Sequence, residues 1–313
     1  MKNLLYTVPE SRKVRYIIHT DCKNEADDQF TVAHCLMTPL LDVKGIIAAH
    51  FNTCFGRYPS ETTAMESYLE VQRVLSAMNL EKEYSVYKGA EKALIDENTP
   101  NDSAGARFII AEAMKDDNRP LYIGLQGSLT DLASAILIEP EICHRMTAIW
   151  IGGGEYPVGG EEFNLMQDIA AANIVMKSDM PLWQVPSNVY KLFSVSLAEL
   201  QCKVRPCGKI GNYLFQQLVD LNLKLCNAVP DFTWPHGELW GLGDEGVLAA
   251  LMHEKQRTDL YHMIPAPQID YETMQYIPTE TNREIRVYDT MDARLTIEDL
   301  FCKLEIYTQT ERQ

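Results

Sequence analysis

Hydrophobic and polar residues alternate along the first half of the chain in a way that predicts strands and helices in turn. The β-rich run Val14–Ile18 is followed by apolar residues from Phe30 to Met37 at the spacing of one helix face. The run Val43–Ala49 precedes a similar helical pattern from Tyr68 to Met78. Further strands are expected at 84–87, 121–125 and 148–151, and further helices at 104–115 and 129–137. This alternation predicts an α/β fold, an open, mostly parallel sheet with helices on both faces and a Rossmann-like core.

The second half of the chain has a weaker pattern. It predicts a strand at 182–185, a helix at 210–223, a helix opening at Gly243-Asp244-Glu245, and a terminal strand and helix from Glu284 onward. No internal repeat, low-complexity tract or linker divides the sequence. We therefore expect residues 1–313 to form a single domain.

The segments that follow the predicted strands are unusually polar. They are His19 to Asp28, His50 to Asn52, Gln126 to Ser128 and Gly152 to Glu155. In open α/β sheets, ligands bind outside the carboxyl ends of the strands, so these segments are where a functional site is expected. The glycines at 152–154 are more typical of a tight turn than of a phosphate-binding loop.

Carboxylates are crowded in the first of these segments, which contains Asp21, Glu25, Asp27 and Asp28 together with Asn24. One of the paired aspartates can cap the following helix and interact with its dipole. Helix capping does not account for the remaining carboxylates. Oxygen ligands gathered at a strand end are typical of a hard divalent cation, so the segment is a candidate metal site.

Charge and motif content exclude several other classes of protein. Lys and Arg number 28 against 44 Asp and Glu, a net charge of −16, which disfavours a nucleic-acid partner or an anionic membrane surface. No apolar run approaches the length of a membrane helix, and no export signal is recognised, so a cytoplasmic location is expected. Neither a P-loop nor a GxGxxG motif follows the first strand. The eight cysteines show no zinc spacing and are interpreted as reduced packing residues.

Five segments in the expected order give the sequence a resemblance to the inosine-uridine nucleoside hydrolase family. The segment from Asp21 to Asp28 resembles the family's DxDPGxDD in a divergent TDxxNExDD form, with a loop two residues longer. The segments that start at Gln126 and Ile149 are similar to TGPLTNLA and VxMGGA. Glu162-Phe163-Asn164 reproduces EFN, followed by Asp168 at the place of a DPEAA-like helix start, and Gly243 to Ala249 resembles HDPxAVA.

The resemblance implies a role for each matching position. The family's metal ligands become Asp21, Asp28, Asp244 and the backbone carbonyl of Gln126, and the implied ion is Ca²⁺, with Mg²⁺ as the alternative. Ribose hydroxyls would be held by Asp27, Asn52, Glu162 and Asn164, and the inserted residues Asn24 and Glu25 would share that task. The family acts on small nucleosides, and we expect a role in purine or pyrimidine salvage and a homodimer or homotetramer.

The implied reaction is metal-dependent hydrolysis of the N-glycosidic bond of a ribonucleoside, which gives ribose and the free base. Its transition state resembles an oxocarbenium ion, so the site must supply an activated water and stabilise positive charge. Asp21 is the candidate general base, acting on a water whose pKa the metal lowers.

The group that would protonate the leaving base is less evident, because many members of the family have a histidine at the position of Gly243, and glycine cannot donate a proton. His236 is the candidate acid, and Trp234 or Trp240 is a candidate stacking partner for a purine, although core packing is the plainer role for Trp240. His19 and His50 also lie at the ends of predicted strands, and for each of them a structural role is as well supported as a role in the site. Two alternatives stay open: a ribosyl-binding protein without turnover, and a hydrolase of another glycoside or a modified nucleoside.

Overall fold

The computed structural model describes residues 4–51, 58–228, 235, 237–253 and 257–309. Its centre is an eight-stranded sheet in the order β3-β2-β1-β4-β5-β6-β12-β9, parallel except for β9, which runs antiparallel to β12. The strands are β1 (Val14–Thr20), β2 (Leu41–Ala48), β3 (Val86–Lys88), β4 (Leu121–Leu125), β5 (Thr147–Ile151), β6 (Leu182–Val185), β9 (Tyr261–Pro265) and β12 (Glu284–Tyr288). The predicted α/β fold with a mostly parallel sheet is confirmed.

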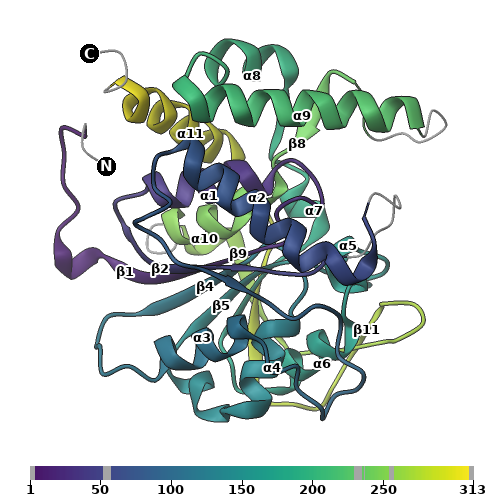
Figure 1. The fold of residues 1–313 in the computed structure, drawn as a ribbon. Helices are drawn as coiled ribbons and strands as arrows, with labels where there is room; N and C mark the ends of the chain where they lie inside the picture. The colour runs from purple at the N-terminus through teal and green to yellow at the C-terminus, as the bar shows by residue number, and fades with distance from the viewer. Residues whose placement is uncertain (1–3, 52–57, 229–234, 236, 254–256, 310–313) are drawn as a thin grey trace.

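Helices cover both faces of the sheet (Figure 1). One face carries α3 (Ala104–Ala113), α4 (Thr130–Ile138) and α6 (Ile169–Lys177). The other face carries α1 (Asp28–Met37), α2 (Thr63–Ala77), α10 (Gly246–His253) and α11 (Ala293–Thr308), with α8 (Leu197–Lys203) and α9 (Gly208–Ala228) outside them. The short helices α5 (Phe163–Met166) and α7 (Ser187–Tyr190) follow β5 and β6. No helix in the described part of the chain is both long and apolar enough to cross a membrane.

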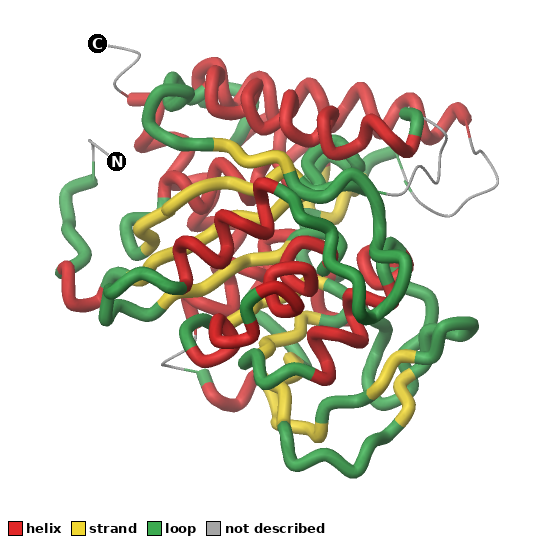
Figure 2. Tube along the Cα trace, turned by 60° about the horizontal axis from the view of Figure 1, so that its bottom comes forward, coloured by secondary structure: helices red, strands yellow, loops and turns green. Residues whose placement is uncertain are grey.

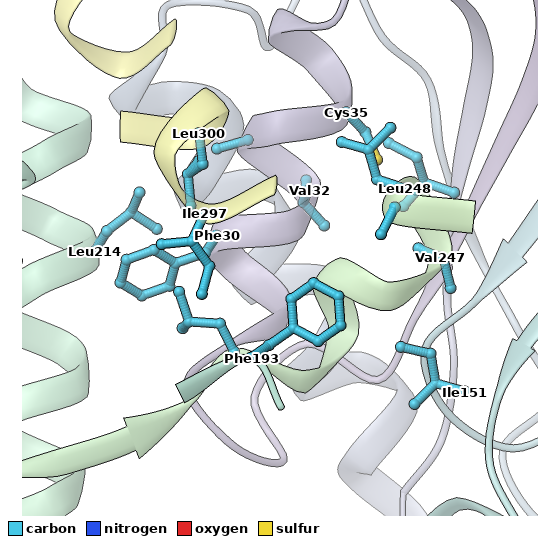
Figure 3. Packing of buried hydrophobic residues seen from close by; sticks show 14 of the residues in the cluster. Phe30, Val32, Cys35, Ile151, Phe193, Leu214, Val247, Leu248, Ile297 and Leu300 are labelled. Atoms are coloured by element: carbon cyan, nitrogen blue, oxygen red, sulfur yellow. The ribbon is translucent and has the colours of Figure 1, made fainter. Parts of the chain in front are cut away.

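Two hydrophobic cores lie on the two faces because side chains of a strand alternate in direction. Ile18 of β1 packs in the core beneath α1 and α10, while its neighbour Ile17 packs in the core with α3 and α4. Figure 3 shows part of the first core, to which α1, α10 and α11 contribute Phe30, Val247 and Leu300. These cores hold the sheet rigid, and its strand ends can therefore position a site.

The structure differs from the sequence prediction mainly at short elements. The strand expected at 84–87 is β3 at Val86–Lys88, and β1 continues to Thr20, because it pairs with β2 as far as Thr20 and with β4 as far as His19. The predicted helix at 210–223 extends to 208–228, and this long helix α9 runs along one edge of the molecule in both Figure 1 and Figure 2. The strand β9 and the two-stranded pairs β7 (Ser194–Ser196) with β8 (Leu239–Gly241) and β10 (Gln268–Ile269) with β11 (Tyr276–Ile277) were not predicted. The strands of the two-stranded pairs have only two or three residues, which is too short for a period to show.

Candidate active site

The polar segments predicted from the sequence come together at the carboxyl ends of β1, β4 and β5. Asp21 follows β1 directly, Gln126 follows β4, and the chain after β5 leads to Glu162. The strand order reverses between β1 and β4, which is the switch point where ligands of open α/β sheets bind. The residues that line the cavity here, called the inner cavity below, are Asp21, Asn24, Glu25, Asp27, Asp28, Gln126, Ile151, Glu162, Phe163, Asn164, Tyr190, Gly243 and Asp244.

Three buried aspartates form the centre of the inner cavity. Carboxylate oxygens of Asp27, Asp28 and Asp244 lie within 4.8 Å of one another, a spacing at which one ion can contact all three. Asp28 is the first residue of α1 and accepts a hydrogen bond from the Thr20 hydroxyl at the end of β1. Asp27 occupies the N-cap position of α1 without making a side-chain cap hydrogen bond, and instead accepts from the Asp244 amide at 3.4 Å. The capping explanation is therefore wrong for Asp27.

Asp21 lines the same cavity, outside this group of three. Its Oδ2 accepts a hydrogen bond of 2.9 Å from the side-chain amide of Gln167, which also donates to Asn164 Oδ1 at 3.1 Å. Gly127 lies against the carboxyl, and a Cβ at that position would be 2.8 Å from Asp21 Cγ. Only glycine at 127 permits this close approach, so the segment after β4 is shaped to receive Asp21.

Burial and mutual repulsion raise the pKa values of the carboxyls in the inner cavity. Burial raises the pKa of Asp21 to about 8, with the Gln167 amide opposing the rise and the charges of Glu25 and Asp27 adding to it. Burial likewise raises the pKa of Asp27 to about 6. The pKa values of Asp28 and Asp244 are raised well above their ordinary range by burial and by the neighbouring aspartates. Carboxyls in this state gain stability from any cation that enters.

The side chain of Gln126 is a second sign that the cavity receives a polar ligand. Its residue is 1% exposed, and neither its amide nitrogen nor its oxygen has a hydrogen-bond partner in the part of the chain that the structure describes. A buried amide without partners costs about 1–3 kcal/mol. A polar ligand in the cavity would supply the missing partner.

The Glu162 carboxylate already accepts four hydrogen bonds. Its carboxylate accepts from the backbone amides of Gly153 at 2.7 Å, Leu165 at 2.9 Å and Asn164 at 3.2 Å, and from the Tyr190 hydroxyl at 2.8 Å. These four bonds match the about four lone-pair sites of a carboxylate. A ribose hydroxyl at Glu162 would therefore have to replace one of them, and the bond from Tyr190 is the one that comes from a side chain.

Asn164 is similarly engaged. Its side-chain amide donates to the backbone carbonyls of Ile151 at 3.0 Å and Gln126 at 3.2 Å. It thereby ties the ends of β4 and β5 to α5. Glu162 and Asn164 thus assemble the walls of the inner cavity as well as lining it.

The longer loop after β1 is held in place by side chains of α2 and α9. Lys23, which has a φ of 123°, pairs with Glu70 of α2 at 3.0 Å, and the side chain of Gln217 in α9 donates to the Ala26 carbonyl at 2.8 Å. Glu70 is fully buried and also accepts from Tyr213 of α9. This anchoring turns Asn24 and Glu25 into the inner cavity.

A second cavity of about 500 Å³, called the outer cavity below, adjoins the first. It is lined by Glu25, Asp27, Tyr190, Lys191, Ser194, Leu239, Trp240, Gly241 and Gly243. Trp240 is 2% exposed and packs in the hydrophobic core, so both of its predicted roles have support. The two cavities share Glu25, Asp27, Tyr190 and Gly243, which form the neck between them.

Five candidate residues are not among the described residues that line the two cavities. Asn52, Trp234 and His236 lie outside the described residues, so their predicted roles stay predictions. His19 and His50 are buried; His19 pairs with Asp131 at 3.1 Å, and His50 lies 2.8 Å from the Thr130 hydroxyl. These contacts support the structural role for both histidines.

Two residues of the site were missed by the sequence reasoning. Gln167 lies three positions after Asn164, one helical turn along, and that spacing was a usable signal. Tyr190 had no comparable signal, because its place depends on how the chain turns after β6. A Cβ at Gly243 would lie 3.0 Å from Tyr190 Cδ2, so the tyrosine ring occupies the space beside the glycine.

Comparison with known proteins agrees with this fold. Residues 16–298 match the family model of inosine-uridine preferring nucleoside hydrolases. The chain therefore belongs to this family, and it is a glycosidase that acts on ribonucleosides. Among curated relatives, the pyrimidine-specific ribonucleoside hydrolase RihA of Escherichia coli O1:K1 / APEC is 24% identical over 229 residues, which cover 65% of this chain and 70% of the relative.

Solved structures share the fold at lower identity. The purine-preferring ribonucleoside hydrolase from Gardnerella vaginalis superposes with a TM-score of 0.74 at 19% identity, covering 95% of this chain and 99% of that one. The type III effector protein XopQ, solved in complex with adenosine diphosphate ribose, gives a TM-score of 0.69 at 14% identity, with 96% and 95% covered. At these identities the similarity to the solved structures supports the fold and nothing further.

Proposed function

We propose that the chain hydrolyses the N-glycosidic bond of a ribonucleoside with the help of one divalent cation, Ca²⁺ in first place and Mg²⁺ as the alternative. The observation that carries the proposal is the group formed by Asp27, Asp28 and Asp244, buried in one cavity with Asp21 and the unpartnered amide of Gln126. Ionised carboxylates this close together are stabilised by a cation, and a polar ligand would satisfy the buried amide.

The donor set fits a hard cation. Asp21, Asp28, Asp244 and the backbone carbonyl of Gln126 would hold it, and all of their ligand atoms are oxygens at one edge of the sheet. The ion supplies Lewis acidity, which makes a water molecule easier to deprotonate near neutral pH. Asp27 completes the group of three carboxylates and also faces the neck, where it is suited to a ribose hydroxyl.

Asp21 is proposed as the general base. Asp21 lines the inner cavity, and the Gln167 amide donates to one of its carboxyl oxygens at 2.9 Å, which fixes the orientation of the carboxyl. The remaining carboxylates stabilise positive charge on the ribosyl ring as the base departs. Asn24, Glu25, Asn52, Glu162 and Asn164 are proposed to bind ribose, and His236 is proposed as the acid for the leaving base.

Gln167→Ala is expected to lower kcat about tenfold and to leave KM within about twofold, because a hydrogen bond to a charged group contributes about 1.5–3 kcal/mol and this one orients the base. The measurement is steady-state kinetics at saturating cation. Gln216→Ala on the exposed face of α9 is the matched control. A change in KM alone would assign Gln167 to substrate binding and contradict the proposed role.

A release assay over purine and pyrimidine nucleosides, with and without chelator, tests the proposed function. We expect ribose and free base to appear with at least one nucleoside, and chelator to reduce the rate at least a hundredfold. Release that chelator does not change would contradict metal dependence. Purine or pyrimidine salvage, a single domain, a cytoplasmic location, a homodimer or homotetramer and the lack of a nucleic-acid partner stay predictions.

A ribosyl-binding protein without turnover is the second candidate. Gly243 favours it, since this position lacks the family's histidine, and so does XopQ, which was solved with a bound ribosyl compound. In that case calorimetry would detect binding of ribose or of a nucleoside while no base is released.

A further inference from the structure

Tyr190 lies in the neck between the two cavities and is bonded to the wall of the inner one. Its hydroxyl donates to Glu162 Oε1 at 2.8 Å, and the residue lines both cavities. Burial and the charge of Glu162 raise the pKa of this phenol well above its ordinary value, so the hydroxyl keeps its proton. In the part of the chain that the structure describes, the hydroxyl makes this one hydrogen bond. Its oxygen is therefore able to accept another.

Backbone contacts hold Tyr190 in position independently of its hydroxyl. It is the last residue of α7, and the backbone amide of Ser187, the first residue of this helix, donates to the Gly153 carbonyl at 3.0 Å. The Gly153 amide donates to Glu162 at 2.7 Å. The Tyr190 carbonyl accepts from the amide of the fully buried Phe193 at 3.1 Å. Removal of the hydroxyl alone is therefore expected to leave the ring and Glu162 in place.

Gly243 provides the space that the Tyr190 ring occupies. A Cβ at position 243 would lie 3.0 Å from Tyr190 Cδ2 and 3.6 Å from Cγ, and the first of these distances is shorter than an ordinary contact between carbon atoms. A larger residue at 243, such as the histidine of many family members, would have to displace the ring. The tyrosine at 190 thus depends on the glycine at 243.

A substrate hydroxyl that approached Glu162 directly would find its acceptor sites in use. Three backbone amides and the Tyr190 hydroxyl already donate to this carboxylate. To displace the tyrosine would leave a buried donor without its acceptor, which is unfavourable. A hydroxyl that instead donates to Tyr190 Oη keeps all four bonds, and a phenol that donates to a carboxylate is a better acceptor, because linked hydrogen bonds polarise one another.

The stereochemistry of a ribonucleoside indicates which hydroxyl lies at the neck. In a β-ribonucleoside the base and the C5′ hydroxymethyl group are on one face of the sugar, and the 2′- and 3′-hydroxyls are on the other. Water attacks C1′ from the face opposite to the departing base. With the carboxylates of the inner cavity on the side of the water and the base in the outer cavity beside Leu239 and Trp240, the 5′-hydroxyl is the one directed toward the neck.

We propose that Tyr190 is a specificity-determining residue that binds the 5′-hydroxyl of the substrate, which donates to Tyr190 Oη while the tyrosine donates to Glu162. The proposal rests on the function proposed above and narrows its substrate class to ribonucleosides with a free 5′-hydroxyl. Glu162 contributes to this contact through Tyr190, as the acceptor that orients the phenol.

A series of deoxynucleosides tests the proposal. Uridine and inosine are each compared with their 2′-, 3′- and 5′-deoxy analogues at saturating Ca²⁺. The kcat/KM of the parent nucleoside divided by that of an analogue is called the 2′, 3′ or 5′ ratio. For the wild type we expect a 5′ ratio of about ten or more, which is the effect of one hydrogen bond in a buried site.

Tyr190→Phe removes the hydroxyl and keeps the ring. It should lower the 5′ ratio about fivefold or more and leave the 2′ and 3′ ratios within about twofold of the wild type, because the 5′-hydroxyl alone loses its acceptor. Tyr271→Phe is the matched control, since this exposed tyrosine also donates to a glutamate, Glu97, at 2.8 Å. The control should leave all three ratios unchanged.

Gly243→Ala disturbs the same contact through the ring. The added methyl group would press on Tyr190 Cδ2 and shift the phenol, so the 5′ ratio should fall while the other two ratios stay close to those of the wild type. Asp27 Oδ2 would be 3.7 Å from the new Cβ, an ordinary contact, so the group of three aspartates is left in place. If Tyr190→Phe does not fold, this variant and the wild-type ratios decide.

The outcomes for the two proposals are separate. A wild-type 5′ ratio below about two, a 5′ ratio that Tyr190→Phe leaves unchanged or raises, or an equal fall of all three ratios would overturn the role of Tyr190 and leave the nucleoside hydrolase function intact. No hydrolysis of any ribonucleoside by Ca²⁺-loaded protein would overturn the proposed function. Calorimetry with ribose and 5-deoxyribose would then decide the role of Tyr190, since ribose should bind more tightly to the wild type and equally with 5-deoxyribose to Tyr190→Phe. The same preference in both proteins, or binding of neither sugar to the wild type, would overturn that role.

Discussion

Asp21→Asn is expected to lower kcat by roughly 10²–10⁴ at saturating cation, which is the usual contribution of a general base. The amide has the volume of the carboxyl, and its oxygen can still accept the hydrogen bond from Gln167, but it does not accept a proton from water. Substrate binding should persist, because most of the groups assigned to ribose lie elsewhere on the cavity wall. The measurement is kcat and KM for wild type and variant over a range of Ca²⁺ concentrations.

The control for this experiment is the cation titration. Asp21 is also a proposed ligand, so a variant studied below saturation would lose rate for the wrong reason. Near wild-type turnover at saturation would exclude Asp21 as the base and would make Glu25, which lines the same cavity, the next group to test.

Stability without a cation is expected to fall as pH rises from about 4 to about 8. Asp21 has a pKa raised from 3.8 to about 8 and Asp27 one raised from 3.8 to about 6, so in this window the folded protein holds protons that the unfolded chain has released. The unfolding free energy therefore decreases with pH, and the loss is complete above the folded pKa values. Thermal melting in chelator at several pH values measures this trend.

A bound cation should reverse the trend. Because it binds the folded state through ionised carboxylates, Ca²⁺ at about a thousand times its Kd adds about 4 kcal/mol, and its effect on Tm should grow between pH 5 and pH 8. Asp244→Asn should weaken the effect, while Asp220→Asn on the outer helix α9 should leave it unchanged. A Tm that is the same with chelator and with Ca²⁺ at pH 8 would contradict a cation site.

Much of the fold could be predicted from the sequence, because the strands of a parallel sheet are buried and therefore appear in the sequence as hydrophobic runs. Leu121–Leu125 and Leu182–Val185 were predicted with the bounds that the structure has. The same logic brought Asp21, Gln126 and Glu162 to one edge, since carboxyl ends of parallel strands meet there. The residue types and the predicted strand ends were enough to predict that these residues lie together.

Contacts between side chains were beyond the sequence. Glu162 was expected only to bind ribose, yet four donors from this chain already surround it, and nothing in the local sequence shows where those donors lie. Tyr190 reaches the neck at the end of α7, and the start of α7 is held by the Ser187 amide, which donates to the Gly153 carbonyl after β5. Such features depend on tertiary structure, whereas Gln167 followed from helical spacing and was simply overlooked.

The anchoring of the longer loop has a consequence for how this protein can change during evolution. Glu70 is buried beneath Lys23, Tyr213 and Gln29, and each of these contacts depends on its negative charge or its acceptor oxygens. Loss of the acid alone would remove the ion-pair partner of the partly buried Lys23 and the acceptor of two polar groups, and Asn24 and Glu25 would lose their support. A substitution at one of these positions is therefore expected to require compensating substitutions at the others. The longer loop at the site therefore depends for its support on residues of α2 and α9, which are not among the described residues that line the two cavities.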